Sequence, residues 1–310
     1  MRRTVLILSL AVLPFMCIGQ QKNVIQKVDK DILFEVRNPA YETESGPIIF
    51  IDEAHNNFHT INGRYRPFAD FLGMDGYRVR PFQNIFTGPA LAPGKILVIS
   101  NALHVSNLEK WTLPTPSAFT EEEIEAVREW VMDGGSLFLI ADHMPMPGAA
   151  AGLAAAFGFT FHNGYAVHRE KAQRRPPIVF SREDRTLLDH AVIEGRNATE
   201  RVQSVATFTG QAFEIPQKAQ PLLIFGSDYV LYFTEEAGKI TTETPQIAIE
   251  GMYQGAVMVY GKGKLAVFGE AAMFTAQRVG KRAMGMNNPA GEQNPQFLLN
   301  IIHWLDGIIE

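Results

Sequence analysis

Short apolar runs alternate with helix-forming segments along much of the chain, and polar or turn-forming residues separate them. The runs at 47–51, 95–100 and 136–141 are almost wholly apolar, which is typical of strands covered on both faces of a parallel sheet. Strand–helix–strand alternation predicts right-handed crossovers and therefore a mostly parallel sheet. The first expected strands are 47–51, 77–82, 95–100 and 136–141, and the first expected helices are 65–74 and 149–157.

The strongest helix signal begins at Thr120. Thr120 and Glu123 have the spacing of a capping box, in which each side chain accepts a hydrogen bond from the other residue's backbone. Ile124, Val127 and Val131 lie on one face of the helix that this box would start. The Asp-Gly-Gly sequence after this face predicts the helix end, and an apolar strand follows it.

The other segments are less regular. Residues 160–245 lose the strand–helix alternation, so we interpret them as an inserted, β-rich segment or subdomain. A Gly-Lys-Gly turn between two apolar runs predicts a hairpin, and Asn294 with Pro295 is expected to cap and begin a last helix. The remaining expected strands are 32–36, 221–225, 229–233, 256–260 and 264–268.

The composition is that of an ordinary globular protein. The chain has 310 residues, of which 46% are hydrophobic and 20% charged, so a single domain can bury a sizeable core. We expect residues 20–310 to form one α/β domain. The net charge of −5 without any Lys/Arg block argues against nucleic acid or an anionic membrane surface as the main partner. No apolar run after the N-terminal segment is long enough to span a bilayer.

Residues 1–19 have the pattern of a secretory signal peptide. Arg2 and Arg3 precede a long apolar run, and Gly19 supplies the small residue before the expected cleavage site. We therefore expect a periplasmic or secreted protein. Lipid anchoring at Cys17 ranks second, because the residues before it are bulkier than those of a lipoprotein signal. Cys17 is the only cysteine, so neither a disulfide nor a nucleophilic thiol would remain after cleavage.

Ionisable or amide residues follow four of the apolar strands, at the point where each strand ends. The carboxyl ends of parallel strands form the ligand crevice of open α/β sheets. We therefore expect one acidic, imidazole-rich pocket; the alternative is that aspartate and asparagine at these ends only cap the helices that follow. The residues concerned are Asp52, Glu53, His55, Asn101, His104, Asp142, His143 and Glu270.

Within this pocket we expect His143 to be the general base or a metal ligand. Asp142 and Glu270 are the expected catalytic carboxylates, because they can orient the imidazole and raise its pKa. The expected ligand is a small molecule or a glycan. The expected substrate contacts are Asn56, Asn101, His104 and Asn287.

A metal site is a further hypothesis for the same region. His55 and His59 form an H-x-x-x-H pair that would share one face if the segment were helical. With Asp52 they would suit a divalent transition metal such as zinc; the alternative is two histidines hydrogen-bonded to their neighbours. No nucleophile-elbow or phosphate-loop motif is present, and Ser100 is the one serine placed like a nucleophile.

Several segments together resemble one protein family. They are FTEEEI from Phe119, DGGSLFLIADH up to His143, DEAH from Asp52, GKLAVFGEAAMF from Gly263 and NPQFLLN from Asn294. They resemble uncharacterised exported bacterial proteins of the class I glutamine amidotransferase-like superfamily, over residues 45–160 and 250–308. The resemblance implies a flavodoxin-like, three-layer α/β sandwich with a mostly parallel central sheet. It does not imply the amidotransferase reaction, because the catalytic cysteine of that superfamily is absent.

These observations favour an exported hydrolase that acts on a small polar or carbohydrate-derived substrate. The alternative is a non-catalytic module that binds a glycan or peptide and has kept the fold without its chemistry. A structural subunit of an envelope complex is a third hypothesis, which a broad exposed apolar patch would support.

Overall fold

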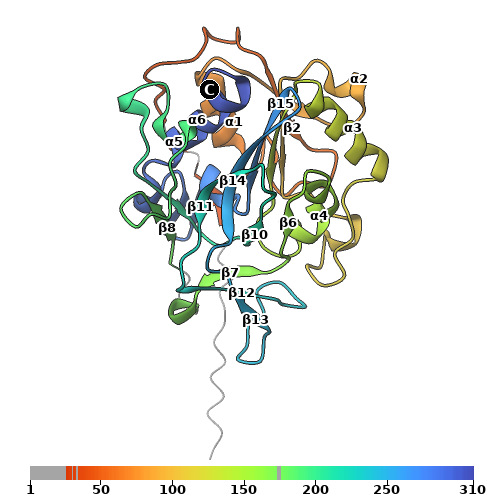
Figure 1. The fold of residues 1–310 in the computed structure, drawn as a ribbon, viewed down its shortest axis with the longest axis vertical. Helices are drawn as coiled ribbons and strands as arrows, with labels where there is room; N and C mark the ends of the chain where they lie inside the picture. Colours follow the sequence, from red (N-terminus) through yellow and green to blue (C-terminus); the bar gives the residue numbers. More distant parts are fainter. Residues whose placement is uncertain (1–25, 30, 33, 173–175) are drawn as a thin grey trace, which may run out of the picture.

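A nine-stranded mixed sheet forms the centre of the protein (Figure 1). The computed structural model describes residues 26–29, 31–32, 34–172 and 176–310. Five adjacent strands are parallel, in the order β3-β2-β4-β5-β15, and β14, β10 and β6 extend the sheet through antiparallel pairings, with β11 also paired to β14. The predicted α/β class with a mostly parallel central sheet is confirmed. The parallel strands are β2 (Ile48–Asp52), β3 (Arg78–Phe82), β4 (Ile96–Ser100), β5 (Ser136–Ile140) and β15 (Gly263–Phe268).

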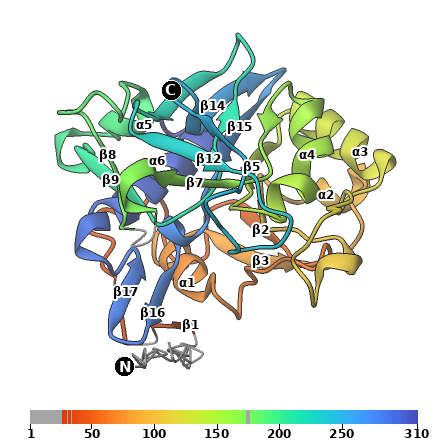
Figure 2. The same cartoon turned by 90° about the horizontal axis from the view of Figure 1, so that it is seen from below.

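Helices cover both faces of this sheet, as the apolar strands predict. Alternate side chains of each strand enter two separate cores: Val98 packs on the side of α1 and α6, whereas Leu97 packs on the side of α2, α3 and α4. Figure 2 shows these two groups of helices on opposite sides of the strands. The helices are α1 (Arg66–Met74), α2 (Gly88–Leu91), α3 (Glu121–Met132), α4 (Met146–Ala156), α5 (Ala191–Glu194) and α6 (Asn294–Asp306).

The predicted capping box is present at the start of α3. The Glu123 backbone N–H donates to Thr120 Oγ1, and the Thr120 N–H donates to Glu123 Oε2, at 3.2 and 3.1 Å. At the other end of the helix Gly134 has a φ of +120°, which an L side chain rarely adopts. A Cβ at Gly135 would lie 2.2 Å from the Trp130 ring. The chain can therefore turn sharply from α3 into β5 only because both residues are glycine.

Mostly short strands fill the segment between α4 and β15. Four of them, β6, β10, β11 and β14, join the central sheet. The strands β7, β12 and β13 form a second sheet, and β8 and β9 pair with each other. The predicted hairpin is confirmed, with β14 antiparallel to β15. The strands are β6 (Thr160–Phe161), β7 (Tyr165–His168), β8 (Ile178–Ser181), β9 (Ser204–Thr207), β10 (Phe213–Glu214), β11 (Gln220–Ile224), β12 (Tyr229–Tyr232), β13 (Gln246–Ala248) and β14 (Tyr253–Tyr260).

Two local predictions are wrong. The described residues of 32–36 form no strand; Phe34 instead packs against Phe71 of α1, with ring centroids 5.2 Å apart. Asn294 is the first residue of α6 rather than its cap, because its side chain bonds to both backbone groups of Ala206. In both cases long-range packing outweighs the local signal.

A small sheet near the N-terminus is formed by β1 (Gln26–Val28), β16 (Ala276–Val279) and β17 (Arg282–Gly285).

In the part of the chain that the structure describes, no helix is both long and apolar enough to cross a membrane. The expected signal peptide, including Cys17, lies outside the described residues.

Candidate functional site

The strand ends that carry the predicted site residues lie along one edge of the sheet. β2, β4, β5 and β15 are parallel neighbours in that order, so the condition for a shared site is met. The order of the five parallel strands along the sheet reverses between β2 and β4 relative to the chain, and ligands of open α/β sheets bind at such a switch point. The loop after β2 crosses this point, since the Phe58 N–H donates to the Asn101 carbonyl at 3.0 Å.

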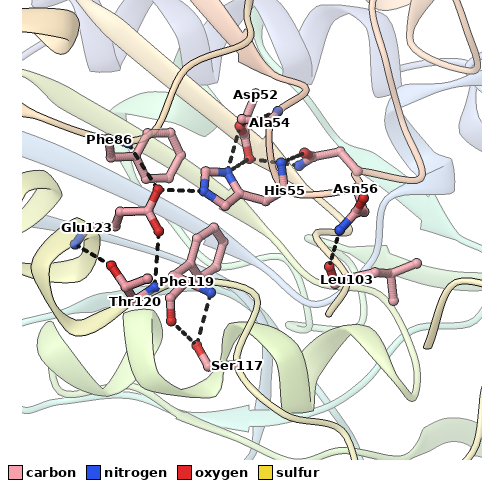
Figure 3. A network of polar contacts seen from close by, with 11 residues as sticks. Asp52, Ala54, His55, Asn56, Phe86, Leu103, Ser117, Phe119, Thr120 and Glu123 are labelled. Atoms are coloured by element: carbon pink, nitrogen blue, oxygen red, sulfur yellow. Dashed lines mark hydrogen bonds and ion pairs between the residues drawn. The ribbon is translucent and has the colours of Figure 1, made fainter. Parts of the chain in front are cut away.

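His55 bridges two buried carboxylates in this loop (Figure 3). Its Nδ1 lies 2.9 Å from Asp52 Oδ1, and its Nε2 lies 2.9 Å from Glu123 Oε1. The rings of Phe86 and Phe119 flank the imidazole at centroid distances of 4.4 and 4.7 Å. Burial alone would lower the pKa of His55, but Asp52 and Glu123 outweigh it and raise the pKa.

Glu123 has a second function in this network. Burial would raise its pKa, but the Thr120 N–H, His55 and the Phe86 N–H together lower it. The Glu123 carboxylate therefore starts α3 and also anchors the loop after β2. Every hydrogen-bonding atom of the His55 side chain is occupied by the chain's own carboxylates, so this imidazole is a structural bridge between β2 and α3.

The geometry gives the metal hypothesis no support. The segment from His55 to His59 is not helical, so the condition under which these histidines would share one face is not met. His59 Nδ1 instead lies 3.4 Å from Ser100 Oγ. Burial, with the charges of Arg64 and His143, lowers the pKa of His59 to about 3. Among the described residues, no three His, Cys, Asp or Glu side chains are grouped so that they could hold a metal ion.

A second pair of carboxylates lies at the ends of β5 and β15. Asp142 Oδ1 accepts the His143 N–H at 2.8 Å, and the Asp142 N–H donates to Asn101 Oδ1 at 2.8 Å. Glu270 is fully buried and accepts the backbone N–H groups of Ala272 and Met273. Burial and the nearby charge of Asp142 raise the pKa of Glu270 well above its usual value. Glu270 therefore keeps its proton to a higher pH than a free glutamic acid.

His143 is the half-buried group beside this pair. Its Nδ1 lies 2.8 Å from the Met144 carbonyl oxygen, and because a carbonyl can only accept, Nδ1 must carry the proton. Nε2 of the neutral ring is then left with a lone pair. The imidazole stacks on Tyr165 at a centroid distance of 4.4 Å and lies 5.9 Å from the ring of Trp111. This arrangement suits a general base with a fixed tautomer.

The predicted substrate contacts use their side chains within the protein. Asn56 Nδ2 donates to the Leu103 carbonyl, and His104 accepts the Ser106 N–H at the start of a short 3-10 helix. Asn101 positions Asp142, as described above. Asn287 lies near the N-terminal sheet, where its Nδ2 donates to Asp29. The structure thus brings Asn101 close to Asp142 and His143, but it does not place Asn287 with them through any hydrogen bond.

Sequence reasoning missed the aromatic side chains around His143. Trp111 and Tyr165 lie in segments without clear periodicity, so no local pattern singled them out. Trp111 also borders a groove of about 750 Å³, and a second groove of about 710 Å³ adjoins it at Thr112 and Glu236. These grooves form where the segment after β4 meets the loop after β12, as the Leu113 N–H donates to the Glu235 carbonyl.

Comparisons with known proteins identify the fold but no family. No family model and no curated protein matches the chain. The mmIFT52 N-terminal domain is similar in structure, with a TM-score of 0.60 at 15% identity, over 84% of this chain and 99% of that domain. The cytoplasmic protein STM3548 from Salmonella typhimurium has a TM-score of 0.50 at 12% identity, over 84% of this chain and 98% of that one.

A ThuA-like protein from Bacteroides uniformis is also similar, with a TM-score of 0.46 at 12% identity, over 88% of this chain and 94% of that one; this likeness is too low to support an inference. These neighbours are not class I glutamine amidotransferases. The prediction that this chain belongs to the exported family of that superfamily is therefore wrong. The segments that suggested it are mostly buried strands and helix ends, where packing favours apolar residues in many unrelated proteins.

Proposed function

We propose that the protein is a hydrolase-like enzyme that acts on a small polar or carbohydrate-derived substrate at the carboxyl edge of the parallel strands. The observation that carries this proposal is the setting of His143. Its Nδ1–H is committed to the Met144 carbonyl, and its ring lies between Tyr165 and Trp111. Nε2 would take a proton from water as the water oxygen attacks the substrate, and would return that proton to the leaving group.

Two carboxyl groups support this role. Asp142 accepts the backbone N–H of His143, and its charge helps to raise the pKa of Glu270. We propose that the negative charge of Asp142, next to His143 in the chain, favours the imidazolium formed during the reaction. Because Glu270 is fully buried, we assign it a positioning role and assign contact with the substrate to His143.

Turnover of ester and glycoside substrates by His143→Gln tests this proposal. Loss of the proton acceptor should lower kcat by about 100-fold to 10,000-fold, whereas the melting temperature should change little. His168→Gln is the matched control, because that half-buried histidine makes a local hydrogen bond to the Glu170 N–H. Turnover retained in His143→Gln would contradict the assignment, and so would an equal loss of turnover in His168→Gln.

A non-catalytic binding module is the second candidate. It is favoured by the large share of polar side chains at this edge that are already hydrogen-bonded within the protein, including Asp52, His55 and Glu123. Saturable binding of a glycan or peptide without turnover, unaffected by His143→Gln, would support this candidate against the enzyme.

The finer architecture and the location of the protein belong to the same proposal. The parallel strands, numbered along the chain, have the order 2-1-3-4-5, which is that of flavodoxin-like folds. We propose a three-layer sandwich of this type in a single domain over 20–310, with 160–245 as an insertion. The pattern of residues 1–19 motivates a periplasmic or secreted location.

A further inference from the structure

Arg64 is a half-buried cation without an anionic partner among the residues that the structure describes. It lies in the loop between β2 and α1, the same loop that carries His55 and His59. Its guanidinium carbon lies 3.9 Å from the centroid of the Phe58 ring, and its Nε donates to Gln277 Oε1 at 3.2 Å. Burial lowers the pKa of Arg64, and no carboxylate of the described residues offsets this effect. A desolvated charge of this kind is costly unless something compensates it.

Three other half-buried arginines form ion pairs, whereas Arg78 donates its Nε to the Gly46 carbonyl and has no carboxylate partner among the described residues. Arg128, Arg182 and Arg196 each form an ion pair with a glutamate at 2.5 to 2.6 Å. The unpaired state of Arg64 does not follow from a shortage of acidic side chains, since the chain has 33 Asp and Glu against 28 Lys and Arg.

The surroundings hold Arg64 in one orientation. Gln277 is fully buried, and its Nε2 donates to Thr275 Oγ1 at 2.7 Å, so its Oε1 is left to accept from Arg64. With Nε bound and one face stacked on Phe58, the two terminal amino groups of the guanidinium have no hydrogen-bond partner among the described residues. Two such donors in one plane match the oxygen atoms of a carboxylate or phosphate.

A line of aromatic rings connects this cation to His143. The Phe58 ring contacts Trp111 edge-on at a centroid distance of 5.1 Å, and Trp111 lies 5.9 Å from His143. The charges of Arg64 and His143 both help to lower the pKa of the buried His59, which lies in the same loop as Arg64. Trp111 is half-buried and also borders a groove of about 750 Å³, which residues 108–112, Glu236 and Ala237 line. This groove leaves space for a small ring against the indole.

We propose that Arg64 binds the anionic group of the ligand, a carboxylate or phosphate carried by a small sugar derivative whose ring lies against Trp111 and reaches His143. This inference rests on the proposed function of the same edge and names its substrate class. The carboxylate and phosphate forms share the same recognition chemistry, and a binding experiment separates them.

Calorimetric titration of the full chain with glucuronate, glucose 6-phosphate and methyl glucoside provides the test. One of the two anions should bind, the neutral sugar should bind more weakly, and Arg64→Gln should weaken anion binding by about tenfold or more. Arg66→Gln is the matched control, because Arg66 is exposed and pairs only with the exposed Asp70. It should bind like the wild type. Arg64→Lys keeps the charge and should bind between the wild type and Arg64→Gln.

Three results would overturn the inference: equal anion binding by Arg64→Gln and wild type, equal binding of the neutral sugar, or no binding of either anion by the wild type. The outcome for His143 stands apart from these. Arg64-dependent anion binding without turnover of any ester or glycoside that carries the bound anionic group would support the inference and contradict the hydrolase proposal. Turnover of a neutral glycoside that needs His143 but not Arg64 would do the reverse.

Discussion

Replacing His55 by alanine tests how far a buried ion network holds the candidate site together. The substitution leaves Asp52 and Glu123 buried, at 0% and 8% side-chain exposure, without the imidazole between them. Breaking one partner out of a buried ion pair typically costs about 3–5 kcal/mol, because the remaining charge is left uncompensated. For a chain of this size that loss corresponds to a fall in melting temperature of about 5–8 °C.

The loss should depend on pH in a defined direction. Burial lowers the pKa of His55, but Asp52 and Glu123 raise it by more than burial lowers it, so the folded pKa lies above 6.5. The stabilisation is thus complete below 6.5 and is lost as the pH rises through the folded value. Glu123 has a folded pKa below 4.5, so its contribution is present above 4.5 and is lost as the pH falls through that lower value. The effect of His55→Ala should therefore be largest between these limits.

Urea denaturation followed by circular dichroism, at about pH 5.5 and about pH 9, measures this difference. His104→Ala is the control, since its ring makes only local bonds to Ser106 and should cost about 1 kcal/mol or less. His55→Gln should fall between the wild type and His55→Ala, because both N–H groups of the amide are on one nitrogen and its oxygen can only accept, so it cannot replace both ring nitrogens of His55. A loss below about 1 kcal/mol at the lower pH, or equal losses at both, would refute the reasoning.

Two further predictions concern Glu270 and the metal hypothesis. Burial and Asp142 raise the pKa of Glu270, so its contribution to stability is complete below pH 4.5 and is lost as the pH rises through the folded pKa. Glu270→Gln should flatten this pH dependence of the melting temperature. It should also cost about 1–3 kcal/mol at every pH, because the amide nitrogen faces a backbone N–H. An unchanged slope would contradict it. Dialysis against EDTA should leave the melting temperature unchanged, because both ring nitrogens of His55 already bind carboxylates; a fall of several degrees would contradict this.

The sequence predicted much of the fold because its signals act over short distances. The apolar run of β4 is buried at every residue, and the capping box at Thr120 and Glu123 links residues three positions apart. The same short range explains the two wrong predictions. Asn294 is a residue type that often caps helices, but its side chain binds the backbone of Ala206, which is distant in sequence. The pattern of residues 32–36 predicts a strand, but Phe34 packs against Phe71 of α1.

The candidate site could be located from the sequence only as far as the edge of the sheet. Residues that follow parallel strands must lie on that edge if the strands are neighbours, and Asp142, His143 and Glu270 do. The partners of each side chain could not be predicted in the same way. The H-x-x-x-H pair suggested a metal, but His55 meets Glu123, which lies 68 positions away.

The sequence by itself determined the alternation of strands and helices, the ends of α3 and the edge at which polar groups collect, because these depend on neighbours along the chain. The tertiary structure alone decided which charges are paired, that the pKa of Glu270 is raised, and that Arg64 lies on Phe58 without an acidic partner among the described residues. The physical reason is that pKa values and ion pairs depend on burial and on the distance between atoms in space, and folding brings together residues that no local pattern connects.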